Sequence, residues 1–99
     1  MGIFSWFDSR EASAFGVALA QRVLRDLPPD IRAEEKRFAK RAEKSLLAAS
    51  RELQAFKRTH DLNMLQKAKL GNAFLWTLRE AGYDADYAGD VTQWMTMQL

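Results

Sequence analysis

The chain has 99 residues, a formal net charge of +2 at pH 7 and no cysteine, which excludes disulfides, thiolate metal ligands and thiol nucleophiles. This length suits a single domain, and no apolar run approaches the roughly 20 residues that a membrane-spanning helix needs. Alanine and leucine are abundant, whereas valine, isoleucine and threonine together number only nine, so the composition is typical of an all-α protein.

The N-terminal segment, residues 1–7, is rich in large apolar side chains. These are Ile3, Phe4, Trp6 and Phe7, and all of them precede the first charged residue. Asp8 followed by Glu11 has the spacing of a helix capping box, which predicts a first helix over residues 8–27. The double proline after this helix ends it, because proline lacks an amide hydrogen and disfavours helical geometry in the residue before it.

A second helix is predicted over residues 30–59, and it should be the longest of the chain. Its apolar positions repeat at heptad spacing in two series, one of Ala42, Ala49 and Phe56 and one of Leu46 and Leu53. A narrow seam that is partly alanine favours close antiparallel packing against another helix. We therefore expect this seam to pack within the chain.

Two shorter helices are predicted over residues 61–81 and 84–97. Gly82 suits the left-handed residue that commonly ends a helix, and Asp84 is a favourable N-cap for the last one. The whole sequence, residues 1–99, is accordingly predicted to be a single helical domain, folded as a compact bundle of three to four helices.

These last two helices differ in their apolar pattern. Apolar residues, among them Met64, Leu65 and Trp76, occur on most sides of helix 61–81, so this helix should be the most buried element. In helix 84–97 the residues expected to face the core are Tyr87, Val91, Trp94 and Met95.

Charge is distributed unevenly along the chain, and residues 32–69 hold eleven basic and five acidic groups. A candidate anion-binding face lies on the second helix, opposite its apolar seam; it consists of Arg37, Arg41, Lys44, Arg51 and Arg58. This face could bind nucleic acid, lipid headgroups or an acidic protein. The alternative is that it is only solvated or is neutralised by the acidic residues near the C-terminus, which are Glu80, Asp84, Asp86 and Asp90.

The sequence offers little for catalysis or for metal binding. Residues 84–90 resemble the start of a calcium loop, but the alignment places Ala88 and Met95 where two of the required ligands should be. His60 is the only histidine, and a histidine packed at a helix end explains it better than a catalytic base. With no glycine-rich phosphate loop and no nucleophile motif, we expect a protein that is not an enzyme and has no cofactor or metal.

We expect the protein to be a small interaction module or accessory subunit in the cytoplasm that binds a protein partner or forms a homo-oligomer. The predicted partner-binding residues are the apolar ones of both termini, namely Ile3, Phe4, Trp6, Phe7, Trp94 and Met97, because exposed aromatic and methionine side chains often anchor partners. The basic helix is the expected second surface.

Other interpretations of the same residues remain open. Residues 3–7 could insert into a membrane interface while the basic face meets anionic headgroups, which would make the protein membrane-peripheral. They could also pack over the first helix as part of the core. Nucleic-acid binding by the basic helix is a third function, although no aromatic residue shares that face.

Overall fold

The computed structural model describes residues 2–29 and 35–99, with side chains described for residues 10–29 and 39–99. The described residues form four helices and no strand: α1 (Gly2–Asp26), α2 (Glu35–Thr59), α3 (Met64–Glu80) and α4 (Ala85–Thr96). The predicted all-α bundle is therefore confirmed. No described helix is long and apolar enough to cross a membrane.

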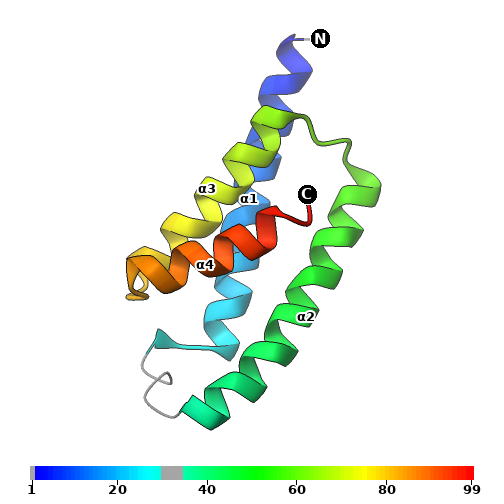
Figure 1. Cartoon of the computed structure of the whole chain (residues 1–99). Coiled ribbons are helices and arrows are strands. Elements are labelled where there is room, and N and C mark those ends of the chain that lie inside the picture. Colours follow the sequence, from blue (N-terminus) through cyan, green and yellow to red (C-terminus); the bar gives the residue numbers. More distant parts are fainter. Residues whose placement is uncertain (1, 30–34) are drawn as a thin grey trace.

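Helix α1 begins at Gly2, so the prediction that it begins at Asp8 was wrong. No proline or glycine separates the apolar segment from Asp8, so nothing in this stretch prevents the helix from extending to the N-terminal side. A capping signal contributes only about 0.5–2 kcal/mol, which is too little to fix a helix start when the residues before it can also be helical. Figure 1 shows the result: the first turns of α1 project beyond the beginning of α3.

Helix α2 ends at Thr59 as predicted, and the predicted start at residue 30 lies outside the described residues. In their described extents α1 and α2 both have 25 residues, so α2 is not longer than α1. The apolar seam of α2 packs within the chain, as predicted. Ala49 and Leu53 are buried in the core, and Phe56 stacks on Phe15 of α1 with 4.1 Å between ring centroids.

The ends of the two C-terminal helices follow local capping chemistry. Asn63 and Gln66 form a capping box at the start of α3: the Asn63 side chain accepts from the Gln66 amide at 2.8 Å, and the Gln66 side chain accepts from the Asn63 amide at 2.6 Å. Gly82 has a φ of +115°, the left-handed geometry expected after a helix. Asp84 caps α4 by accepting from the Tyr87 amide at 2.8 Å, which confirms the predicted cap.

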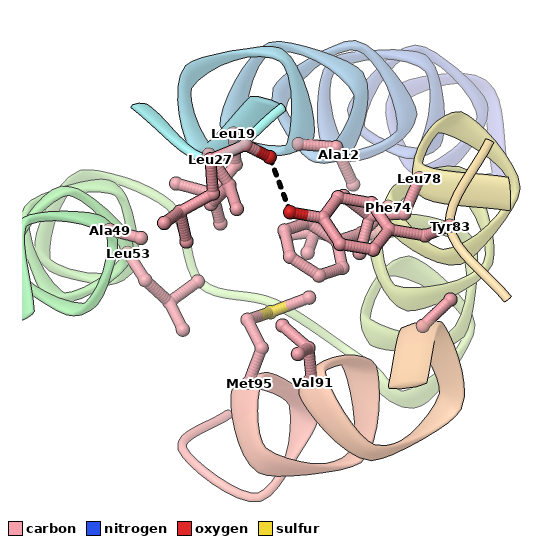
Figure 2. Packing of buried hydrophobic residues seen from close by; sticks show 14 residues of the cluster. Ala12, Leu19, Leu27, Ala49, Leu53, Phe74, Leu78, Tyr83, Val91 and Met95 are labelled. Atoms are coloured by element: carbon pink, nitrogen blue, oxygen red, sulfur yellow. Dashed lines mark hydrogen bonds between the residues drawn. The ribbon is translucent and has the colours of Figure 1, made fainter. Parts of the chain in front are cut away.

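The core lies where the four helices meet, and its closest helix pair is α1 with α3. Figure 2 shows side chains from all four helices converging on it. Its largest fully buried members are Leu19, Leu27, Leu53, Leu70, Phe74, Leu78 and Met95. Helices α1 and α3 can approach this closely because Gly16 lies at their contact: a Cβ at this position would be 2.3 Å from the carbonyl oxygen of Leu70.

One buried hydrogen bond joins the end of α1 to the turn between α3 and α4. The hydroxyl of Tyr83, a buried side chain, donates to the backbone carbonyl of Leu27 (Figure 2). This carbonyl lies just after the last residue of α1, where the helix itself supplies no partner.

Replacing Tyr83 with phenylalanine should lower the free energy of unfolding by about 1–3 kcal/mol, because the Leu27 carbonyl would stay buried without a donor. Urea denaturation followed by circular dichroism at 222 nm measures this loss. A Tyr83→Phe protein as stable as the wild type would show that the carbonyl finds another donor.

Candidate protein-interaction surface

The outer face of α3 carries large apolar side chains that the rest of the described fold does not cover. Met64 is 87% exposed, Leu65 is 55% exposed and Trp76 is 48% exposed. The opposite face of the same helix is buried against the core through Leu70, Phe74 and Leu78. We call the residues Met64, Leu65, Ala68, Asn72 and Trp76, which share one side of the helix at 100° per residue, the α3 outer face.

The expectation that α3 would be the most buried helix was therefore wrong for one of its sides. Apolar residues all round a helix favour burial on every side. In this fold α1 and α4 pack against α3 from one side only (Figure 1), so the other side stays open. The apolar pattern was visible in the sequence, but the pattern alone does not distinguish a core face from an exposed one.

A shallow apolar groove between α3 and α4 adjoins the α3 outer face. Its lining includes Met64, Ala68, Gly71, Leu75, Thr96 and Leu99. The two helices come close together at Gly71, where a Cβ would be 2.7 Å from Cγ2 of Thr96. The lining thus combines short side chains with larger apolar ones, and Lys67, Asn72 and Thr92 add polar groups to it.

A cation lies over the aromatic ring at the far end of this surface. The guanidinium carbon of Arg79 is 5.0 Å from the centroid of the Trp76 ring, within the range of a cation–π interaction. Because Arg79 follows Trp76 by three residues on the same helix, this contact restricts the rotamers of an exposed tryptophan. A restricted aromatic side chain loses less conformational entropy when a partner covers it.

Of the predicted partner-binding residues, only those near the C-terminus have described side chains. Ile3, Phe4, Trp6 and Phe7 belong to the first turns of α1, and their side chains lie outside the described part of the structure. At the other terminus, Met97 is 79% exposed and Trp94 is 39% exposed, so the prediction that Trp94 faces the core was wrong.

The C-terminus is held at the middle of the molecule. The Ser50 hydroxyl donates to the Gln98 side chain at 2.5 Å, and the Lys57 ammonium group donates to the Gln98 carbonyl at 2.6 Å. Figure 1 accordingly places the C-terminus beside α2, whereas the first turns of α1 lie at one end of the molecule. The backbone at the start of α1 and the C-terminus thus lie in different parts of the fold.

The basic face of α2 is exposed as predicted at Arg41, Lys44, Arg51 and Arg58, while the side chain of Arg37 lies outside the described residues. Glu80, Asp86 and Asp90 are also exposed, and none of the three forms an ion pair with this basic face in the part of the chain that the structure describes. These three acidic residues therefore do not neutralise the basic face of α2 through ion pairs.

His60 has the structural surroundings expected of a histidine at a helix end. Its ring stacks on Phe56 with 4.0 Å between centroids, and its Nε2 is 3.0 Å from Oε2 of Glu11 on α1. Among the side chains described, those of residues 10–29 and 39–99, no group of three histidine, cysteine, aspartate or glutamate residues is placed to hold a metal ion. At the start of the calcium-like stretch, Asp84 instead accepts a helix-capping hydrogen bond from the Tyr87 amide.

Comparison with known proteins gives no further guide to function: the chain matches no protein-family model, no curated protein and no solved structure.

Proposed function

We propose that the protein is a non-enzymatic helical interaction module that binds another protein through the α3 outer face and the adjoining α3–α4 groove. The observation that supports this proposal is the exposure of Met64, Leu65 and Trp76 together on one side of a helix whose other side is core. Large apolar side chains exposed along one side of a helix commonly mark an interaction site, since their contact with water is unfavourable until a partner covers them.

The chemistry of this surface suits a partner that presents an apolar ridge, such as one side of an amphipathic helix. A ridge of this kind would fit the α3–α4 groove, whose lining is mostly apolar and includes small residues such as Ala68 and Gly71. On the α3 outer face, Trp76 would be the main residue that anchors the partner, because tryptophan is among the residues that most often dominate interface energies. Methionine at the other end adapts its shape readily to different partners.

Site-specific photo-crosslinking in the native cells tests this function and captures the partner whatever its identity. A photoreactive amino acid at the exposed position Asn72, between Leu65 and Trp76 on the α3 outer face, should give discrete adducts with a protein. The same amino acid at Arg51, on the exposed face of α2, is the matched control and should give fewer or none.

The adducts should depend on the apolar side chains beside the probe. With Leu65→Glu and Trp76→Glu added, crosslinking from position 72 should fall at least about tenfold, because two buried apolar contacts would become unpaired buried charges. The proposal would be contradicted by equal crosslinking from positions 72 and 51, or by adducts from position 72 that persist in the double variant.

A second candidate function is membrane attachment through the N-terminal segment. It is favoured by the backbone of residues 2–7, which is helical and projects beyond the start of α3 (Figure 1). An apolar helix end of this kind could enter the membrane interface while basic groups contact anionic headgroups. Flotation with phosphatidylcholine–phosphatidylglycerol vesicles tests it, and Phe4→Ser with Trp6→Ser should abolish binding if the segment is the anchor.

A further inference from the structure

A small polar depression lies where the last turn of α1 meets the first half of α2, and none of its lining residues belongs to the α3 outer face. It is lined by Arg25 and Asp26 of α1 and by Arg41, Lys44 and Ser45 of α2. Three cations and one carboxylate give this lining a formal net charge of +2. None of the three cations forms an ion pair with a carboxylate in the described part of the chain.

Two turns further along α2, a basic residue of α1 is neutralised by an acidic residue of α2. There Arg22 of α1 forms an ion pair with Glu52 of α2. Ser45 lies seven residues before Glu52 and therefore on nearly the same side of α2. A glutamate at position 45 could pair with the basic groups of the depression in the way that Glu52 pairs with Arg22. The residue at this position is Ser45, whose hydroxyl is neutral, so the basic groups are not paired there.

Ser45 supplies a second, independent observation. Its side chain is 3% exposed, yet its hydroxyl has no hydrogen-bond partner among the described residues. Leaving a buried hydroxyl unsatisfied is unfavourable, and alanine already occupies the neighbouring seam positions 42 and 49 without this cost. The hydroxyl is closed off from solvent, so it can donate to an anionic oxygen in the depression once its χ1 angle rotates toward the lining cations.

We propose that this depression is a binding site for a phosphate monoester group, which the side chains of Arg25, Arg41 and Lys44 contact from two helices and to which the Ser45 hydroxyl donates. A phosphate monoester carries a charge of about −1.5 to −2 at pH 7, which complements the lining. Guanidinium groups bind its oxygens through paired hydrogen bonds, and the compact ammonium group of lysine adds a point charge. This site is independent of the proposed protein-interaction surface.

The test is calorimetric titration of the full chain with glycerol 3-phosphate at low ionic strength, with glycerol and with sodium chloride of equal ionic strength as blanks. We expect saturable binding with one site per chain. Arg25→Gln with Arg41→Gln should weaken binding by at least about tenfold, because charged hydrogen bonds from both helices are lost. Arg51→Gln with Arg58→Gln changes the net charge equally on the exposed face of α2 and should leave the affinity nearly unchanged.

The Ser45→Ala variant tests whether the Ser45 hydroxyl binds the phosphate group or is only buried. It should weaken glycerol 3-phosphate binding several-fold while leaving the unliganded protein at least as stable as the wild type. An unchanged affinity in this variant would remove the hydroxyl from the site. An absence of saturable binding, or an equal loss in the Arg51→Gln, Arg58→Gln control, would overturn the whole proposal.

Vesicles distinguish a soluble source of the phosphate group from a lipid one. Phosphatidic acid presents a phosphate monoester, whereas phosphatidylglycerol presents only a diester. Stronger binding to phosphatidic acid vesicles than to glycerol 3-phosphate, with the same dependence on Arg25 and Arg41, would support the site and assign it to a lipid headgroup. Equal binding to both lipids at matched surface charge, insensitive to Arg25 and Arg41, would contradict it.

Discussion

Replacing Gly16 with alanine should lower the free energy of unfolding by about 1–3 kcal/mol, as is typical when a methyl group is forced into a packed interior. The added Cβ would lie 2.3 Å from the Leu70 carbonyl oxygen and 3.2 Å from Cβ of Ala73. The first of these atoms belongs to the backbone of α3, so no side-chain rotation relieves the overlap. Helices α1 and α3 would have to move apart, and the core between them would lose contacts.

Gly89→Ala is the matched control for this prediction. Apart from its chain neighbours and the backbone of its own helix, no atom lies within 4 Å of a Cβ built at Gly89, which is inside α4. Alanine there should raise stability by about 0.5–1 kcal/mol, because it restricts the unfolded chain and favours the helix. Urea denaturation of both variants measures the difference. A Gly16→Ala protein that gains as much stability as Gly89→Ala would show that α1 and α3 can separate without losing core contacts.

Phe74→Ala should lower the free energy of unfolding by about 3–5 kcal/mol, the range for removing a large aromatic side chain from a core. Phe74 is 1% exposed and lies among side chains from the surrounding helices (Figure 2). The change removes its apolar contacts and leaves a cavity that its neighbours cannot fill completely. Because domains of this size have only about 5–15 kcal/mol of stability, the loss should be visible as a large fall in melting temperature.

Trp76→Ala, two residues along the same helix, is the contrasting substitution. About half of the Trp76 surface is already exposed to water, so its truncation should cost only about 1–2 kcal/mol. It should nevertheless reduce crosslinking from position 72, which Phe74→Ala should affect only through unfolding. If Trp76→Ala destabilised the protein as much as Phe74→Ala, the α3 outer face would be a structural element rather than a binding surface.

Much of the fold was predictable because helix ends depend on local chemistry. The double proline after α1, the glycine after α3 and the aspartate before α4 each fix a boundary through the backbone geometry or donors of a few adjacent residues. The start of α3 was missed by three residues because the Asn63–Gln66 capping box is recognisable only when asparagine is counted with serine and threonine. The N-terminal extension of α1 was missed because a capping pattern does not exclude helix before it.

The exposure of individual apolar residues was less predictable. Helical periodicity identifies which residues share a side, but it does not say which sides other helices cover. Phe74 and Trp76 are both aromatic residues of one helix, and only the positions of α1 and α4 make the first a core residue and the second a surface residue. The depression at Ser45 was equally invisible, because it combines residues from two helices that are far apart in sequence.

The close contact between α1 and α3 also sets the order in which this chain can acquire its structure. All of α2 lies between these two helices in sequence, so their meeting closes a long loop, whereas α3 and α4 are adjacent and can pair with little loss of chain entropy. On the ribosome, α1 emerges before α3, and its apolar side stays without its main partner until synthesis has passed α3. The core between the four helices therefore cannot form while α1 and α2 alone have been made.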